Sequence, residues 1–222
     1  MERLYKYKTE MHCHTAQSSL KCGKMSAEDV VEIYINAGYS TLLITDHYGG
    51  VHLSEKGAEY DICTFLEGYN TAKAVSDEIN IILGMEINLY ANKNDYLIYG
   101  ITEEIIRKNP EIYKYNISEL CDFAHKNGLL VYQAHPFRNN LCIVPPGICD
   151  GIEVFNSHPR HDSRNDIALA WAKKYNLNTI SGSDAHKPED MAISGIRTKY
   201  EIKTSDDLLN TLKSCDYKLI TL

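Results

Sequence analysis

The feature of this sequence that most constrains its fold is the alternation of short apolar segments with longer amphipathic ones along the whole chain. We expect extended segments at residues 5–14, 41–45, 80–86, 95–101, 129–134, 151–155, 178–181, 196–202 and 217–220. We expect helices at residues 26–38, 54–77, 118–128, 163–175 and 205–214. Such alternation is typical of parallel strands joined by crossover helices, and six or seven such strands fit a barrel better than a short open sheet. The sequence therefore predicts one α/β domain over residues 1–222, built on a barrel-like sheet.

Side chains that can bind metal ions fall where the predicted strands end. They are His12 and His14 in a His-Cys-His motif, His47, Glu86, His135, and Asp184 with His186 in an Asp-Ala-His motif. In α/β barrels the chemistry collects at the carboxyl ends of the strands, because the loops that follow them form one face. Alternate residues of a strand point to the same side, so the two imidazoles of His-x-His can grip one ion or two neighbouring ions. Each motif alone is weak evidence, but seven such side chains at strand ends predict a polynuclear site and metal-assisted hydrolysis.

Loops predicted on the same face add candidate substrate-binding residues. Arg138 follows His135 by three residues, and a guanidinium suits a phosphate because it can donate two parallel hydrogen bonds. Residues 156–164 follow another predicted strand and contribute His158 and Arg160, either as a solvated loop or as a substrate-binding loop. The remaining candidates are assigned no role: we expect His52 and His125 on the surface and Cys13 in the core.

Composition limits the classes of partner. A formal net charge of −7 argues against general nucleic-acid binding, which needs a basic stripe, but is compatible with a small anionic substrate at a metal site. No apolar run approaches the roughly 20 residues of a membrane-spanning helix, and the charged start of the chain does not read as a signal peptide. Seven cysteines without a Cys-x-x-Cys pair do not suggest a disulfide framework or a zinc ribbon. We therefore expect a cytoplasmic protein without a membrane partner.

At these residues the chain resembles the polymerase-and-histidinol-phosphatase (PHP) family of metal-dependent phosphoesterases, and the resemblance runs over the whole chain. It rests on five motifs in the family's order: His12-Cys13-His14-Thr15, Ile44-Thr45-Asp46-His47, Gly84-Met85-Glu86, Ala134-His135-Pro136 and Gly182-Ser183-Asp184-Ala185-His186. The resemblance implies a distorted (β/α)7 TIM-like barrel around two or three divalent ions of zinc, manganese or iron. It implies that the seven side chains named above are the ligands, that Glu86 bridges two ions, and that Asp46 orients its neighbour rather than binding directly.

The chain departs from the family pattern in two places. Where the family usually has another ligand after the first motif, this chain has Ser18-Ser19-Leu20. Where the family usually has a histidine on the strand after the glutamate, this chain has Asn94-Asp95-Tyr96-Leu97, in which Asp95 could substitute. These departures bear on a third ion and do not affect a two-metal site.

The function expected from these residues is hydrolysis of a phosphate ester on a small substrate. Two ions would lower the pKa of a shared water, and the resulting hydroxide would attack phosphorus in line. Arg138 and Arg160 would neutralise phosphoryl charge, so Asp46 and Arg138 are the candidate catalytic residues beside the metal ligands. An amidohydrolase-type metal hydrolase is the nearest alternative, although such an enzyme would usually have a bridging lysine. A non-catalytic, metal-binding regulatory domain is the alternative from another class.

Overall fold

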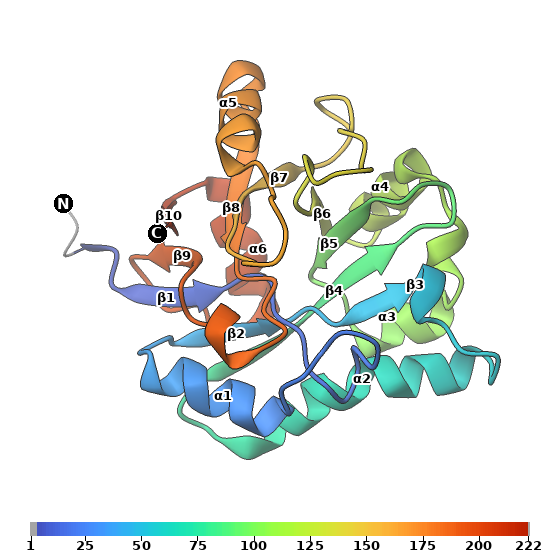
Figure 1. Cartoon of the computed structure of the whole chain (residues 1–222), viewed down its shortest axis with the longest axis horizontal. Helices are drawn as coiled ribbons and strands as arrows, with labels where there is room; N and C mark the ends of the chain where they lie inside the picture. The colour runs from blue at the N-terminus through green and yellow to red at the C-terminus, as the bar shows by residue number, and fades with distance from the viewer. Residues whose placement is uncertain (1–3, 222) are drawn as a thin grey trace.

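The computed structural model describes residues 4–221, which form a single ten-stranded sheet with helices around it (Figure 1). The strands are β1 (Tyr7–Glu10), β2 (Thr41–Ile44), β3 (His47–Gly49), β4 (Asn80–Asn88), β5 (Asp95–Tyr99), β6 (Leu130–Gln133), β7 (Gly151–Asn156), β8 (Asn178–Gly182), β9 (Gly195–Thr198) and β10 (Tyr217–Ile220). The α-helices are α1 (Ala27–Asn36), α2 (Ala58–Val75), α3 (Glu103–Lys108), α4 (Ile117–Lys126), α5 (Asn165–Tyr175) and α6 (Ser205–Ser214). Short 3-10 turns lie at η2 (Gly50–His52), η3 (Ile112–Lys114) and η4 (Pro188–Asp190).

The sheet curls into a nearly closed barrel. Its strand order is β10-β9-β1-β2-β4-β5-β6-β7-β8, with β3 paired to β4. The barrel closes where the segments after β1 and β8 run side by side: Asp184 N donates to the His12 carbonyl at 2.8 Å, and His14 N donates to the Ala185 carbonyl at 3.1 Å. This closure confirms the expected TIM-like α/β barrel. It also brings the first and last ligand motifs of the sequence into direct contact.

The expectation of parallel strands throughout is wrong for two strands. β5 runs antiparallel to both β4 and β6, and β9 runs antiparallel to both β1 and β10. The chain between β4 and β5, residues 89–94, is too short for the helical crossover that a parallel connection needs. The reversal of β5 has a consequence for the site, because the start of that strand, Asp95, lies at the rim where the parallel strands end.

Side chains alternate between the barrel interior and the surrounding helices. On β5, Leu97 and Tyr99 belong to the interior cluster, whereas Tyr96 and Ile98 pack outward with Leu120 of α4. This period of two follows from the pleat of the strand. The interior is therefore a packed core rather than a pore, as in other α/β barrels.

Helix α6 lies at the end of the barrel opposite the ligand motifs. Its Leu208 and Leu212 are fully buried in the interior cluster, and each such leucine contributes about 1.5–3 kcal/mol to folding. A Cβ atom on Gly100, which follows the far end of β5, would lie 2.9 Å from Leu209 Cδ1, so α6 packs tightly at that end. Helix α6 thus fills this end of the barrel interior.

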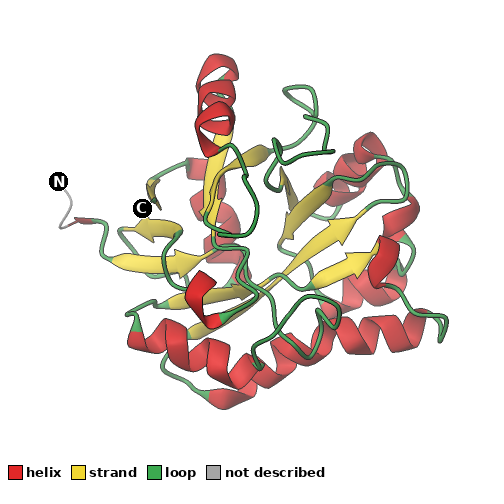
Figure 2. Cartoon of the chain, in the orientation of Figure 1, coloured by secondary structure: helices red, strands yellow, loops and turns green. Residues whose placement is uncertain are grey.

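The helices cover the outside of the sheet, as Figure 2 shows. Helices α1 and α2 run along one side, and α3 and α4 lie at another (Figure 1), while α5 packs against β7 through Ala168 and Ala172. All five expected helices are present, most of them with shifted ends; α2, for example, begins at Ala58 rather than at residue 54. The short helix α3 was not expected. Ser26 is the N-cap of α1, since its side chain accepts from Asp29 N at 3.2 Å. No helix within residues 4–221 combines the length and the apolarity needed to cross a membrane.

Candidate metal centre

The structure brings all seven predicted side chains to one rim of the barrel. His12 and His14 follow β1, His47 begins β3, His135 follows β6, and Asp184 and His186 follow β8. Glu86 lies inside β4, which continues two residues beyond the predicted end, to Asn88. All seven residues are buried or nearly so.

The carboxylate of Glu86 stands at the centre of the cluster and presents one oxygen to each of two groups of imidazoles. Glu86 Oε1 lies 3.3 Å from His12 Nε2 and 3.1 Å from His135 Nε2. Glu86 Oε2 lies 3.2 Å from His14 Nε2 and 3.0 Å from His47 Nδ1. A carboxylate with different donor groups on its two oxygens has the arrangement expected of a bridge between two ions.

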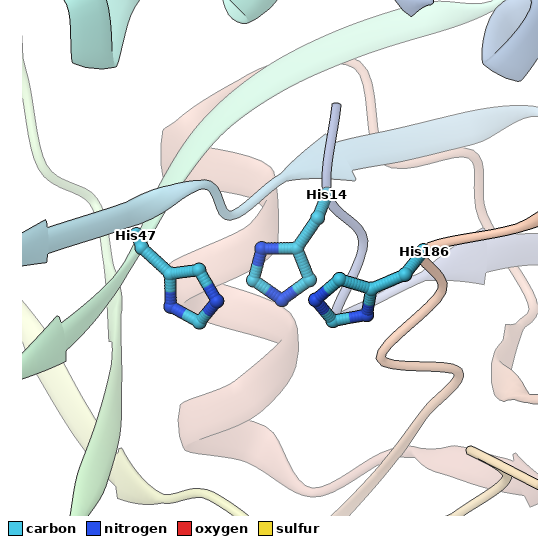
Figure 3. A group of neighbouring side chains, drawn as sticks. All are labelled: His14, His47 and His186. Atoms are coloured by element: carbon cyan, nitrogen blue, oxygen red, sulfur yellow. The ribbon is translucent and has the colours of Figure 1, made fainter. Parts of the chain in front are cut away.

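Asp184 and His186 complete the two groups. Asp184 Oδ1 lies 3.3 Å from His14 Nε2 and 3.7 Å from His12 Nε2. His186 Nδ1 lies 2.8 Å from the Asp184 carbonyl oxygen, so this nitrogen can donate there and leave Nε2 as the free lone pair. The rings of His47, His14 and His186 stand side by side (Figure 3), and one nitrogen of each lies within 4.8 Å of one nitrogen of the other two.

The unpaired polar atoms of this cluster fit a metal centre. Among residues 4–221, His12 Nε2, His14 Nε2, His47 Nδ1 and Glu86 Oε2 are buried without a hydrogen-bond partner. Such atoms are costly in a folded protein unless something binds them. Their separations of 3.0–3.3 Å are close to the roughly 3.3–3.6 Å between ligand atoms that tetrahedral bonds of about 2.0–2.2 Å produce. Three overlapping sets of donors lie within 4.8 Å of one another: His14, His47 and His186; His12, His14, Glu86 and Asp184; and Glu86, Asp95 and His135.

The buried carboxylates of the cluster also favour positive charge beside them. Burial alone would lower the pKa of His14, but Asp184 and Glu86 raise this pKa to about 9. Burial opposes ionisation of Glu86, yet His12 and His47 hold its pKa well below the ordinary value. The carboxylates thus remain charged and draw cations to the cluster, either protons on the histidines or bound metal ions.

An open cavity of about 620 Å³ leads to this cluster. Glu86, His47, His135, Asp184 and His186 line it, and so does Asp95, which the reversed β5 carries to this rim. A cavity of this volume suits a small organic molecule rather than a free phosphate ion alone.

Comparison with known proteins decides the family. The family model of the PHP domain matches residues 10–207, which is most of the chain. This chain is a member of the PHP domain family. Among curated proteins, the uncharacterized protein MJ0417 of Methanocaldococcus jannaschii is 30% identical over 139 residues, which cover 55% of this chain and 56% of that protein. The match thus spans about half the length of that relative.

Solved structures share the fold of this PHP domain. PsfC from Pseudomonas syringae PB-5123 superposes with a TM-score of 0.70 at 16% identity, covering 91% of this chain and 87% of that one. A two-domain protein from Bacteroides vulgatus ATCC 8482, which contains a predicted PHP-like metal-dependent phosphoesterase, superposes with a TM-score of 0.64 at 16% identity. That match covers 97% of this chain and 64% of the two-domain protein. At such identities the likeness establishes the fold.

Two buried glutamates outside the predicted set hold the candidate ligands of this PHP domain in place. Glu153 Oε1 lies 3.0 Å from His12 Nδ1, and Glu153 Oε2 accepts from the backbone N–H of His135 at 2.9 Å. Glu10 Oε1 accepts from the backbone N–H groups of His12 and Ser183 at 2.9 and 3.0 Å. Each was visible only as a charged residue within an apolar strand. Such partners fix the tautomer and orientation of metal-ligating histidines.

Asp46 supports the cluster through the turn that follows His14. It accepts from Thr15 N and Thr15 Oγ1, each at 2.7 Å, and from Ser19 Oγ at 2.6 Å, while Ser19 Oγ also lies 3.2 Å from His14 Nδ1. Helix α2 approaches this turn closely at Gly68, where a Cβ atom would lie 2.0 Å from Thr15 Oγ1. Ser19 therefore connects Asp46 to His14.

The predicted substrate-binding residues all line the cavity, but their hydrogen bonds differ. Arg138 donates through Nη2 to Asp184 Oδ2 at 2.5 Å and to Asn156 Oδ1 at 2.7 Å. Arg160 forms a two-pronged ion pair with Asp190, at 2.8 and 2.6 Å. His158 is buried and lies 3.0 Å from Arg160 through its Nε2. Both guanidinium groups are thus partly occupied by carboxylates of the protein.

His52, expected at the surface, is half-buried instead. Its ring stacks on that of His47, with ring centroids 4.0 Å apart, and it lines the cavity. The turn η2 brings His52 back toward the site, and no local pattern in the sequence predicts this position. His125, by contrast, is half exposed and pairs with Asp150 at the surface, as expected, and Cys13 is fully buried in the core.

Proposed function

We propose that this PHP domain hydrolyses phosphate esters with the help of two divalent metal ions. The observation that carries the proposal is the set of buried, unpartnered donor atoms on both sides of the Glu86 carboxylate, at the floor of an open cavity. One ion would be held by His14, His47 and His186 with Glu86 Oε2. The other would be held by His12, His135 and Asp184 with Glu86 Oε1.

When bound, two such ions supply Lewis acidity for the phosphoryl oxygens and a water of lowered pKa as nucleophile. The protein's own groups have separate tasks. Glu86 fixes the two donor groups relative to each other, and Glu153 and Asp46 orient the imidazoles through their second nitrogens and the adjoining turn. No serine or cysteine nucleophile is required.

Arg138 is the side chain best placed to contact the phosphoryl group beside the metal ligands. It lines the cavity, and its Nη2 is anchored by Asp184 and Asn156, so its position is fixed before a substrate arrives. A preorganised guanidinium stabilises charge on the transferring phosphoryl group without reorganising during the reaction. Arg160 is committed to Asp190 and acts mainly by holding the wall formed by residues 186–190.

The experiment that tests the proposal is a hydrolysis assay on protein stripped by a chelator and reloaded with manganese, zinc or iron. The substrates are p-nitrophenyl phosphate and a panel of phosphorylated metabolites. We expect no turnover in the stripped protein and metal-dependent release of phosphate after reloading. Tight metal binding without hydrolysis of any ester would instead indicate a regulatory metal-binding domain. Hydrolysis of amides or lactones, but not of esters of phosphate, would indicate an amidohydrolase.

Glu86→Gln provides the matched variant for this assay. It keeps the size of the side chain and removes its negative charge, so we expect metal content and turnover to fall together. Glu103→Gln, on the exposed face of α3, removes one charge away from the cavity and should leave both unchanged. Wild-type metal content and turnover in Glu86→Gln would contradict the bridging role.

A further inference from the structure

The cavity wall beside His186 carries two lysines that the proposed reaction does not use. Four cationic side chains line the cavity: Lys24, Arg138, Arg160 and Lys187. The two arginines are each paired with a carboxylate of the protein, Asp184 and Asp190 respectively. Within residues 4–221, neither Lys24 nor Lys187 forms an ion pair, so their charges face the cavity uncompensated.

The backbone holds these two lysines next to each other. Lys24 N donates to the His186 carbonyl at 2.9 Å, which places Lys24 beside the residue that precedes Lys187. Lys187 N in turn donates to Asp190 Oδ2 at 3.0 Å, and the same carboxylate is fixed by Arg160. The two lysines therefore lie on the same wall of the cavity, although they come from opposite ends of the sequence. Hydrogen bonds fix the backbone of both.

Two uncompensated ammonium groups on one wall attract an anion. An anion bound at this wall would be attracted by both charges. The chain has 30 acidic and 23 basic residues, so acidic partners are abundant, yet none pairs with either lysine in the described structure. The scissile phosphate itself belongs at the floor of the cavity, against the Glu86 cluster, and the cavity is large enough for a second group.

We propose that Lys24 and Lys187 bind a second anionic group of the substrate, a phosphate or a carboxylate, while its scissile phosphate meets the Glu86 cluster. The preferred substrates are then small phosphate esters that carry two separated anionic groups. This inference rests on the proposed phosphoesterase function for its substrate, and on the unpaired lysines for its binding site.

The test compares esters that differ only in the second anion. Fructose 1,6-bisphosphate is compared with fructose 6-phosphate, and 3-phosphoglycerate with glycerol 3-phosphate, so that the two pairs distinguish a phosphate from a carboxylate. The variants are Lys24→Ala/Lys187→Ala and, as a control that removes two charges from the outside of α5, Lys173→Ala/Lys174→Ala. The kcat/KM of the manganese-loaded proteins is measured for each ester.

We expect the wild type and the control to prefer the doubly anionic ester of at least one pair by about tenfold or more, as charge-assisted hydrogen bonds allow. The double variant in the cavity should lose this preference and keep its kcat/KM for the singly anionic esters within about twofold. The preference should also shrink as salt is added, because the lysines face solvent. Equal losses for both members of each pair would overturn the inference, since the lysines would then act on the scissile phosphate, and unchanged kinetics would overturn it as well.

A binding measurement separates this inference from the proposed function. Isothermal titration of the chelator-treated protein with the two fructose phosphates reports the anion site without turnover. If no ester is hydrolysed, but the bisphosphate binds more tightly and this difference disappears in Lys24→Ala/Lys187→Ala, the proposed function fails and the anion site stands. If esters are hydrolysed without any effect of the lysines on binding or preference, the anion site fails and the proposed function stands.

Discussion

Replacing Glu153 with glutamine tests whether the buried carboxylate behind the cluster controls metal binding. Glu153 accepts from His135 N and Asn156 Nδ2, each at 2.9 Å, through one oxygen and faces His12 Nδ1 at 3.0 Å through the other. A glutamine keeps only one acceptor oxygen. If its NH₂ faces His135 N and Asn156, two donors oppose it. If its NH₂ faces His12, that ring must accept through Nδ1 and carry its proton on Nε2, the nitrogen that faces Glu86.

Either orientation weakens the site without removing a ligand. Loss of a partner that orients a metal-bound histidine typically costs 10- to 100-fold in metal affinity, or about 1.4–2.7 kcal/mol. We expect a loss of this size for Glu153→Gln when the zinc or manganese Kd is measured by competition with a chelator. The exposed Glu103→Gln variant serves as the control. A folded Glu153→Gln protein with wild-type metal Kd would refute the reasoning, because the orientation of His12 would then not depend on Glu153.

Variants at three further residues probe other parts of the site. Burial raises the pKa of Glu10 from 4.5 to about 6. As the pH rises, the carboxyl group therefore loses its proton in the unfolded chain before it does so in the folded protein. The free energy of unfolding of the wild type should thus fall by roughly 2 kcal/mol between pH 4.5 and 6. In chelator-treated Glu10→Gln, thermal unfolding measured over this pH range should not show that fall in stability. A stability difference between the variant and the wild type that does not change with pH would contradict the raised pKa of Glu10. Arg138→Ala should lower kcat/KM for phosphate esters by about 10²-fold, on the order of 2.7 kcal/mol, with partial rescue in Arg138→Lys; wild-type kinetics would remove Arg138 from the phosphoryl site. His52→Phe keeps the stack on His47 but removes the ring nitrogens, so metal content should hold while kcat/KM falls about tenfold; equal kinetics would make His52 a packing residue only.

The sequence predicted the site better than it predicted the sheet. The seven donors converge because each lies after or near the carboxyl end of a strand, and the carboxyl ends of parallel strands meet at one rim whatever the details of the helices. His12 and Asp184, far apart in the sequence, thus lie 3.7 Å apart through Nε2 and Oδ1. Local patterns suffice for such a convergence, because it depends on the order of elements and not on exact contacts.

Strand direction and the supporting residues depend on contacts that local patterns do not contain. The reversal of β5 follows from the short connection at residues 89–94, and it alone explains why Asp95 reaches the cavity. Glu153 resembles any charged residue in a strand until the closed barrel places it behind His12. His52 reaches the cavity only through the path of the turn after β3. The position of each of these side chains depends on how distant parts of the chain come together in the folded protein.

The most direct test of the two-metal proposal is anomalous diffraction from crystals of the manganese- or zinc-loaded protein. The arrangement of donors predicts two strong peaks on opposite sides of the Glu86 carboxylate, one beside His14, His47 and His186 and the other beside His12 and His135. A further peak beside Asp95 would add a third ion to the same cluster. A single peak, or none within bonding distance of Glu86, would contradict the two-metal account of this PHP domain.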